Sequence, residues 1–266
     1  MPMPRSRPSS RRQPPSGTKR DCLVIAHRGD SSRCPENTLS AFASAHAAGA
    51  DGIELDVRLC ADGIPVVCHD PTLARFHAGR ARLALRTLAE LRSLSVGSWF
   101  APRFAAERLP TLLEVLTRFP SLTVFIELKP QTGRSLTAQA ANRRLVDAVI
   151  ATVAEARAAR RVALLCFDPR ILALSARRAP HLRRIRNHER PVDAPRPWLD
   201  RQPGIAGICF DQRVLTPALV AAARQRGLAV FAYTCNEQAV LTRLRRLALD
   251  GLLTDRPAWL TKRLAL

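Results

Sequence analysis

Five residues in the first half of the chain have the types and spacing that catalysis requires. His27 and His69 stand on either side of a Glu-x-Asp pair, Glu54 and Asp56, and Glu127 follows in the segment I-E-L-K. Each lies in, or directly after, a short apolar run typical of a β-strand. Grouped carboxylates attract a cation and imidazole titrates near neutral pH, so the set indicates cation binding together with acid–base chemistry.

The three carboxylates are the candidate metal ligands. Side chains two apart in a strand share a face, so Glu54 and Asp56 should point the same way, with Ile and Leu neighbours opposite. Glu127 and Lys129 repeat the arrangement on a later strand. Converging carboxylates need a neutralising charge, and hard oxygen ligands suit Mg²⁺ or Ca²⁺ better than zinc. The alternative is that they form salt bridges with the abundant arginines.

The two histidines are candidates for general acid and base, and two cations stand beside them. His27 and His69 each end an apolar run, where a histidine is otherwise a hydrogen-bonded structural residue. Arg28 and Lys129 place positive charge near the carboxylates, where it could bind a phosphate and stabilise its transition state.

Four further polar residues lie close to these positions in the sequence pattern. Asn37 is a candidate N-cap for the first helix, and Glu36 could reach His27 or form a salt bridge. Asp255 ends the last strand-like run and should face the same site, with a hydrogen-bonding role. His188 follows another strand-like run and has no comparable context.

Short apolar runs alternate with longer helical patterns from residue 21 onward, which predicts a (β/α)₈ barrel. A doubly wound open sheet is the competing architecture, but eight strands and the lack of a Gly-rich phosphate loop favour the barrel. The expected strands are Leu23–His27, Gly52–Val57, Thr123–Lys129, Val162–Phe167, Arg183–Asn187, Ile205–Phe210, Leu228–Thr234 and Gly251–Thr254. The expected helices are Asn37–Ala48, Thr87–Leu94, Thr111–Arg118, Leu136–Arg160, Pro169–Arg177, Thr216–Arg226 and Glu237–Leu247.

The segment between the second and third barrel strands is too long for one helix and its loops. Pro65–Cys68 reads as an extra short strand that ends at His69, and the rest, through Trp99 and Phe104, should be an insertion on the barrel. Long insertions in compact domains are often functional.

Composition restricts the class of protein. The 266 residues carry a net charge of +20, almost all from arginine, and 47% are apolar. The charge favours anionic partners, or else reflects arginines that solvate helix faces. No run approaches the roughly 18 apolar residues of a membrane-spanning helix. Seven cysteines without a C-x-x-C pair fit a reducing compartment, so we expect a cytoplasmic protein.

Residues 1–20 form a tail rich in Pro, Ser and Arg, and residues 21–266 form the expected barrel domain. The tail has too little apolar surface to order itself, and no apolar segment of an export signal follows its arginine pair. It could contact an acidic membrane surface weakly, but the lack of interleaved aromatic residues argues against specific nucleic-acid binding.

An ordered set of motifs resembles the glycerophosphodiester phosphodiesterase family over almost everything after residue 21. The matching pieces are H-R-G at 27–29, P-E-N-T at 35–38, G-A-D-G-I-E-L-D-V at 49–57, D-G-I-P-V-V-C-H-D at 62–70, G-S-W-F at 97–100, L-P-T-L-L-E-V-L at 109–116, I-E-L-K-P at 126–130 and L-L-T-D-R-P at 252–257.

The resemblance implies a TIM-like barrel that hydrolyses glycerophosphodiesters to sn-glycerol 3-phosphate and an alcohol. It implies one divalent cation, Mg²⁺ or Ca²⁺, at Glu54, Asp56 and Glu127, and His27 and His69 as the acid–base pair. Arg28 and Lys129 would then lie near the phosphate, and Trp99 and Tyr233 would bind substrate.

Three departures from the family pattern concern the substrate pocket. They are Arg75-Phe76-His77, Cys166-Phe167 and Tyr233, the last standing where the family usually has Trp. Two alternatives therefore stay open: a related phosphodiesterase that acts on lysophospholipids, with a lipid tail against Trp99, Phe100 and Phe104, and a non-catalytic anion-binding protein.

Overall fold

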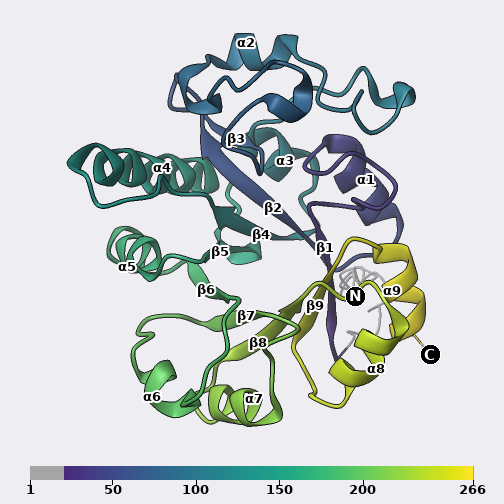
Figure 1. Ribbon diagram of the computed structural model, residues 1–266, viewed down its shortest axis with the longest axis vertical. Coiled ribbons are helices and arrows are strands. Elements are labelled where there is room, and N and C mark those ends of the chain that lie inside the picture. Colours follow the sequence, from purple (N-terminus) through teal and green to yellow (C-terminus); the bar gives the residue numbers. More distant parts are fainter. Residues whose placement is uncertain (1–20, 266) are drawn as a thin grey trace, which may run out of the picture.

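Eight parallel strands close into a barrel in the computed structural model, which describes residues 21–265 (Figure 1). Their order around the ring is β1-β9-β8-β7-β6-β5-β4-β2, and pairing of β1 with β2 closes it. The predicted barrel is therefore confirmed over the open sheet. The strands are β1 (Leu23–His27), β2 (Gly52–Leu59), β4 (Thr123–Leu128), β5 (Val162–Cys166), β6 (Arg183–His188), β7 (Gly207–Asp211), β8 (Ala229–Tyr233) and β9 (Gly251–Thr254).

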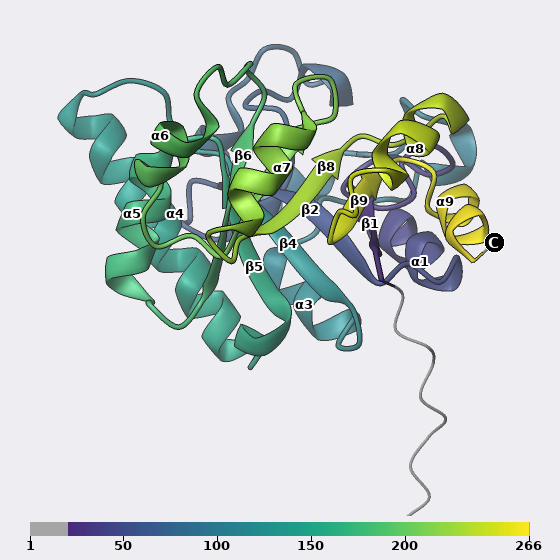
Figure 2. The ribbon, with the colours of Figure 1, turned by 90° about the horizontal axis from the view of Figure 1, so that it is seen from below.

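Helices surround the strands (Figure 1), and α9 lies beside α1, so the two ends of the barrel domain meet (Figure 2). The α-helices are α1 (Leu39–Ala47), α2 (Leu88–Ser93), α3 (Leu112–Arg118), α4 (Leu136–Glu155), α5 (Pro169–Arg178), α6 (Pro195–Asp200), α7 (Pro217–Arg224), α8 (Gln238–Arg245) and α9 (Pro257–Leu264). Short 3₁₀ turns are η1 (Ala74–Phe76), η2 (Leu83–Leu85), η3 (Pro102–Phe104) and η4 (Ala159–Arg161).

Two helix predictions were wrong in detail, and two helices were missed. The first helix is capped by Thr38, whose hydroxyl accepts from the Ala41 amide, and not by Asn37. The long helix predicted to Arg160 ends at Glu155, because Arg157 takes a left-handed conformation (φ 51°) and a 3₁₀ turn leads into β5. Helices α6 and α9 were not predicted, and both begin with proline in the first turn.

Apolar side chains form one layer inside the barrel wall and one layer outside it. The inner layer fills the barrel with alternate residues of the strands, among them Ile25, Phe125, Leu165, Ile185 and Phe231. The outer layer, far larger, packs the other strand faces against the helices. This alternation follows from the two-residue period of a strand, and it seals the floor of the barrel beneath its C-terminal mouth.

The predicted insertion lies between the second and third barrel strands, β2 and β4, and is confirmed. It begins with β3 (Pro65–Val67), which pairs antiparallel with β2. Its side chains bury a separate small core that includes Leu73, Leu83, Leu91 and Val96. The insertion therefore packs as a compact unit beside the barrel, at the top of Figure 1.

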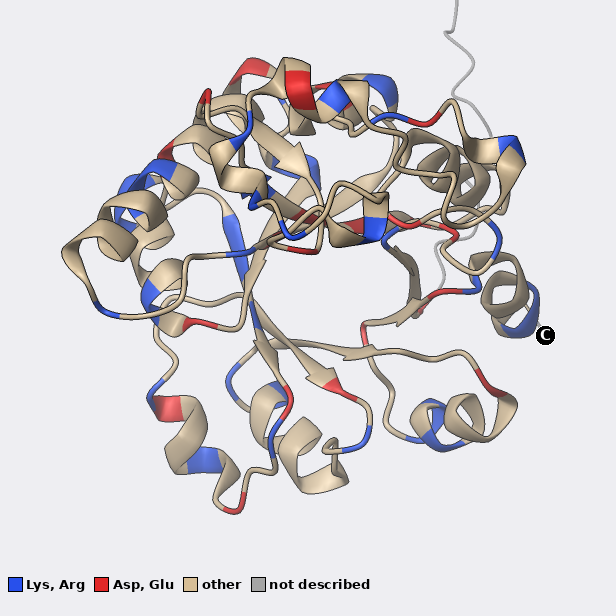
Figure 3. Ribbon diagram, turned by 45° about the horizontal axis from the view of Figure 1, so that its top comes forward, with Lys and Arg blue, Asp and Glu red and all other residues tan. Residues whose placement is uncertain are grey.

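Basic residues are spread over the helices around the barrel instead of gathering on one of them (Figure 3). All seven cysteines are free, and six are buried. Within residues 21–265 no helix combines the length and the apolar character needed to cross a membrane. The weak membrane contact predicted for residues 1–20 lies outside the described residues.

The turn after β1 carries two successive left-handed residues, Arg28 (φ 57°) and Gly29 (φ 85°). A Cβ atom at Gly29 would lie 2.7 Å from the Cβ and carbonyl carbon of Ala41 in α1. Glycine is therefore required there for conformation and for space.

Replacing Gly29 with Ala should lower the free energy of unfolding by about 2–4 kcal/mol, from the left-handed backbone and the overlap with α1. The matched control is Gly63→Ala, since Gly63 is also left-handed (φ 75°) but has nothing within 4 Å of the new Cβ. That variant should lose only about 1–2 kcal/mol. Urea unfolding of both variants measures the difference, and equal losses would contradict a close approach of the turn to α1.

Candidate active site

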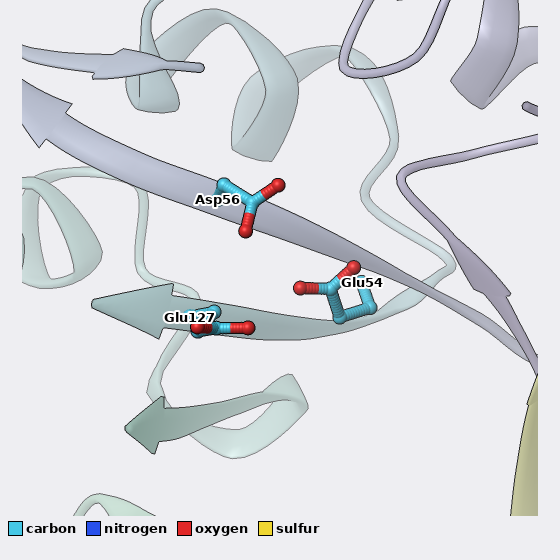
Figure 4. A group of neighbouring side chains, drawn as sticks. All are labelled: Glu54, Asp56 and Glu127. Carbon is cyan, nitrogen blue, oxygen red and sulfur yellow. The ribbon is translucent and has the colours of Figure 1, made fainter. Parts of the chain in front are cut away.

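Strand register brings the predicted carboxylates and His27 together at the mouth of the barrel. Pairing of β1 with β2 sets His27 beside Glu54, and pairing of β2 with β4 sets Asp56 beside Glu127. The three carboxylates are 1%, 0% and 8% exposed. Figure 4 shows them turned toward one another from β2 and β4, and one oxygen of each lies within 4.8 Å of the others.

Two cationic side chains touch this carboxylate cluster. Lys129 Nζ lies 2.9 Å from Asp56 Oδ1 and 2.5 Å from Glu127 Oε1, and Arg28 Nε lies 3.2 Å from Asp56 Oδ2. The salt-bridge alternative is thus partly realised, but these cations concentrate on Asp56. The backbone amide of Arg28 reaches Glu54, donating to its Oε2 over 3.1 Å.

Burial and mutual repulsion separate the pKa values of the carboxylates. Burial, aided by the charge of Asp56, raises the pKa of Glu54 well above its usual range. Burial also raises the pKa of Glu127, although Lys129 opposes it. Burial alone would raise the pKa of Asp56 too, but Lys129 and Arg28 outweigh it and lower that pKa. The cations of the protein therefore stabilise the ionised form of Asp56, but they do not offset the effect of burial on Glu54 and Glu127.

The donor set fits a hard divalent cation. All three groups offer carboxylate oxygens, which Mg²⁺ and Ca²⁺ prefer. Glu54 Oε1 is buried and has no hydrogen-bond partner, an arrangement that is costly unless a cation or another ligand meets the oxygen.

His27 is fixed by a carboxylate on its far side. Its Nδ1 donates to Asp255 Oδ1 over 2.7 Å, and its Nε2 lies 3.9 Å from Glu54 Oε2. Asp255 is held in turn by Asn236 and Ser31. Burial would lower the pKa of His27, but the Asp255 hydrogen bond and the charge of Glu54 outweigh it and raise the pKa. The mouth-facing, hydrogen-bonding role expected for Asp255 is confirmed.

His69 follows β3 and has a carboxylate partner of its own. Its Nδ1 lies 2.8 Å from Asp70 Oδ1, and its carbonyl accepts two hydrogen bonds from the Arg58 guanidinium, at 2.9 and 2.7 Å. Burial is the main cause that lowers the pKa of His69, while Asp56 opposes it. Asp70 and Arg58 were missed from the sequence, although Asp70 stands directly after His69.

Asn37 is a site residue in a role that the sequence did not predict. It is buried with φ 59°, its side-chain amide donates to Asp56 Oδ2 over 2.8 Å, and its Oδ1 accepts from the Asp56 amide over 3.2 Å. Glu36 forms salt bridges with Arg28 and Arg75, at 3.1 and 2.7 Å. The motif P-E-N-T therefore supports the carboxylate cluster as well as opening a helix.

Three further positions singled out from the sequence, Tyr233, Trp99 and His188, make ring contacts outside the carboxylate cluster. The Tyr233 ring stands edge-on to Phe167, with ring centres 6.3 Å apart, and its hydroxyl is buried without a partner. Trp99 lies under the guanidinium of Arg75, at 5.1 Å, and donates its indole N–H to the carbonyl of Val96. His188 packs against Trp198 and Phe210, which also contact each other.

Comparison with known proteins agrees with this geometry. Residues 27–259 match the model of the glycerophosphoryl diester phosphodiesterase family. A glycerophosphodiester phosphodiesterase of Caldanaerobacter subterraneus is 33% identical over 88% of this chain and 94% of its own length.

Two solved structures share the fold. A phosphodiesterase of Oleispira antarctica, in complex with the product sn-glycerol-3-phosphate, superposes with a TM-score of 0.82 at 27% identity, over 92% of this chain and 97% of that one. A glycerophosphodiester phosphodiesterase of Agrobacterium tumefaciens superposes with a TM-score of 0.74 at 27% identity, over 89% and 97%. The family match extends from the first histidine of the site to the last helix, and the chain belongs to the glycerophosphoryl diester phosphodiesterase family of enzymes.

Proposed function

We propose that this protein hydrolyses glycerophosphodiesters to sn-glycerol 3-phosphate and an alcohol, with a divalent cation at Glu54, Asp56 and Glu127. The observation that carries the proposal is the buried carboxylate cluster between two histidines, each with its own aspartate partner. The sn-glycerol-3-phosphate held by the Oleispira phosphodiesterase supports the product.

Arg28 and Lys129 are the proposed phosphate-binding residues. Both are mostly buried beside the cluster, and its carboxylates raise the pKa of each against the opposing effect of burial, so both stay charged. When bound, Mg²⁺ or Ca²⁺ supplies the Lewis acidity that polarises the phosphoryl oxygens. The guanidinium and ammonium groups would stabilise the negative charge that grows on the same oxygens.

His27 is the proposed base and His69 the proposed acid. His27 would take the proton of the attacking hydroxyl, from water or from the adjacent glycerol, and Asp255 fixes its tautomer. The charge of Glu54 helps to raise the pKa of His27, so a cation held by Glu54 would favour the unprotonated base. Asp70 holds the Nδ1 of His69, which leaves Nε2 to carry the proton that the departing alcohol would take.

A small alcohol suits the site better than a lipid tail. Trp99, Phe100 and Phe104, offered from the sequence as a lipid surface, pack edge-on against each other with ring centres 5.6 and 5.7 Å apart. Arg75 lies over the ring of Trp99, and Arg103 over that of Phe104. Trp99 and Tyr233 would border a small substrate. The free cysteines support the proposed cytoplasmic location.

Release of sn-glycerol 3-phosphate from a panel of glycerophosphodiesters tests the function directly. Turnover of a glycerophosphodiester but not of lysophosphatidylcholine is expected. Turnover of lysophosphatidylcholine alone would favour the lysophospholipid alternative, and anion binding without any turnover would favour a non-catalytic protein.

Chelation should abolish activity, and added Mg²⁺ or Ca²⁺ should restore it. Cation binding should tighten as the pH rises from about 5 to about 8, because protons held by Glu54 and Glu127 must leave before these groups coordinate. The free energy of unfolding of the cation-free protein should change in the opposite direction over the same pH range. There the folded state holds more protons than the unfolded chain, so its free energy of unfolding falls over this window.

The measurement is the rise in melting temperature on adding cation to EDTA-dialysed protein. It should be larger at the higher pH, and Glu54→Gln should reduce it sharply. Full activity after exhaustive dialysis against EDTA would contradict the metal assignment.

Replacing His27 or His69 with Ala should lower kcat by roughly 10²–10⁴-fold while cation binding survives. A nitrophenyl ester separates the roles, because its leaving group needs little protonation. On that ester His69→Ala should recover much of its rate and His27→Ala should not. Rescue of His27→Ala instead would reverse the roles, and wild-type rates in both variants would remove the histidines from the chemistry.

A further inference from the structure

A groove of about 660 Å³ opens beside the carboxylate cluster, between the loop that joins β4 to α4 and the loop that joins β5 to α5. Glu127 and Lys129 line it, so it is continuous with the reacting centre. Arg134 lines it from the loop before α4, and Arg170 lines it from the first turn of α5. Its volume falls within the range of small-molecule sites, and a group attached to the phosphate could extend into it.

The arginines that line the groove are only partly neutralised. Arg170 forms a paired contact with Asp168, with Nη2 2.5 Å from Oδ2 and Nε 3.0 Å from Oδ1. Arg134 and Arg58 have no carboxylate partner at ion-pair distance among residues 21–265, and Arg58 hydrogen-bonds the neutral carbonyl of His69. The lining carboxylates, Asp168 and Glu127, each have a cationic partner already.

A further arginine lies on the strand next to the groove, beside the lining residue Cys166. Arg186 on β6 has a buried Nε and Nη1 without a hydrogen-bond partner. The ionisable groups that act on it, Cys166 and Asp168, both line the groove. Helix α4 also begins at this edge, with the neutral Ser135 as its N-cap and no acidic residue in its first turn, so its N-terminal dipole adds to the positive potential.

We propose that this groove holds the departing alcohol and selects alcohols that bear a negative charge of their own, as a carboxylate or phosphate, over ammonium alcohols such as ethanolamine and choline. The inference rests on the proposed function. The groove borders the side of the site that holds His69, whose carbonyl Arg58 binds, and His69 is the proposed proton donor to the alcohol. An anionic group there meets unpaired guanidinium groups, whereas an ammonium group meets like charge.

The test compares glycerophosphodiesters with leaving alcohols of similar size: glycerate (anionic), glycerol (neutral) and ethanolamine (cationic). The quantity is the ratio of kcat/KM for the glycerate and ethanolamine esters. Because the intrinsic reactivity of each ester is the same for every variant, it cancels when the ratios of variant and wild type are compared. The variants are Arg134→Gln and Arg134→Lys, with Arg143→Gln as control. Arg143 is an exposed arginine of α4, the helix that follows Arg134, and does not line the groove.

Arg134→Gln should lower the ratio about 3- to 10-fold, mainly through KM of the glycerate ester, with little change for the glycerol ester. Arg134→Lys should keep most of the preference, Arg143→Gln should keep all of it, and added salt should weaken it in the wild type. An unchanged ratio in Arg134→Gln, with all three esters turned over, would overturn the charge selection alone. Turnover of none of the esters would overturn the proposed function, and this inference with it.

Discussion

The concentration of negative charge at the barrel mouth is the constraint on which the rest of the site depends. Three carboxylates lie within 4.8 Å of one another in surroundings almost sealed from water, where repulsion is strong. Arg28 and Lys129 supply positive charge to the cluster, and the raised pKa values of Glu54 and Glu127 mean that protons relieve part of the remaining repulsion. A divalent cation at the proposed site would take the place of those protons, and the negative charge of a phosphodiester would then offset the positive charge that the cation adds.

The barrel makes this arrangement stable because it separates the charge from the packing. On β2 and β4 the same two-residue period that turns Glu54, Asp56 and Glu127 inward turns Ile53, Leu55 and Ile126 outward into the main core. Beneath the carboxylates the barrel is filled by apolar residues, so water cannot reach the cluster from below. Rigid strands thus hold groups that would otherwise move apart, and loops supply the more variable contacts around them.

How much the sequence could predict depends on the range of each interaction. The strands, and the faces on which their carboxylates lie, follow from the two-residue period of a strand. The eight barrel strands and the carboxylates of β2 and β4 were therefore predicted. Helix α6 was missed because it has only six residues, two of them proline, which leaves little local pattern. Helix α9 is as long as α7 and α8, which were predicted, and also begins at proline as α7 does, so neither its length nor its proline explains why it was missed. Asn37 was taken for a cap because its residue type suits one. Its actual role depends on a left-handed backbone and on a strand 19 residues away.

That left-handed backbone explains how one loop positions two carboxylates. Arg28 and Asn37 both have positive φ, which is unfavourable for residues with side chains, and the Asn37 amide donates to the Arg28 carbonyl over 3.0 Å. The loop between β1 and α1 is thereby closed on itself. From it the Arg28 amide fixes Glu54, and the Asn37 side chain fixes Asp56 through both its donor and its acceptor. With Oδ2 held in this way, Asp56 presents Oδ1 to Lys129 and toward Glu127 on the next strand. The strained loop thus sets the orientation of the carboxylates before any cation or substrate arrives, which reduces the reorganisation that binding requires.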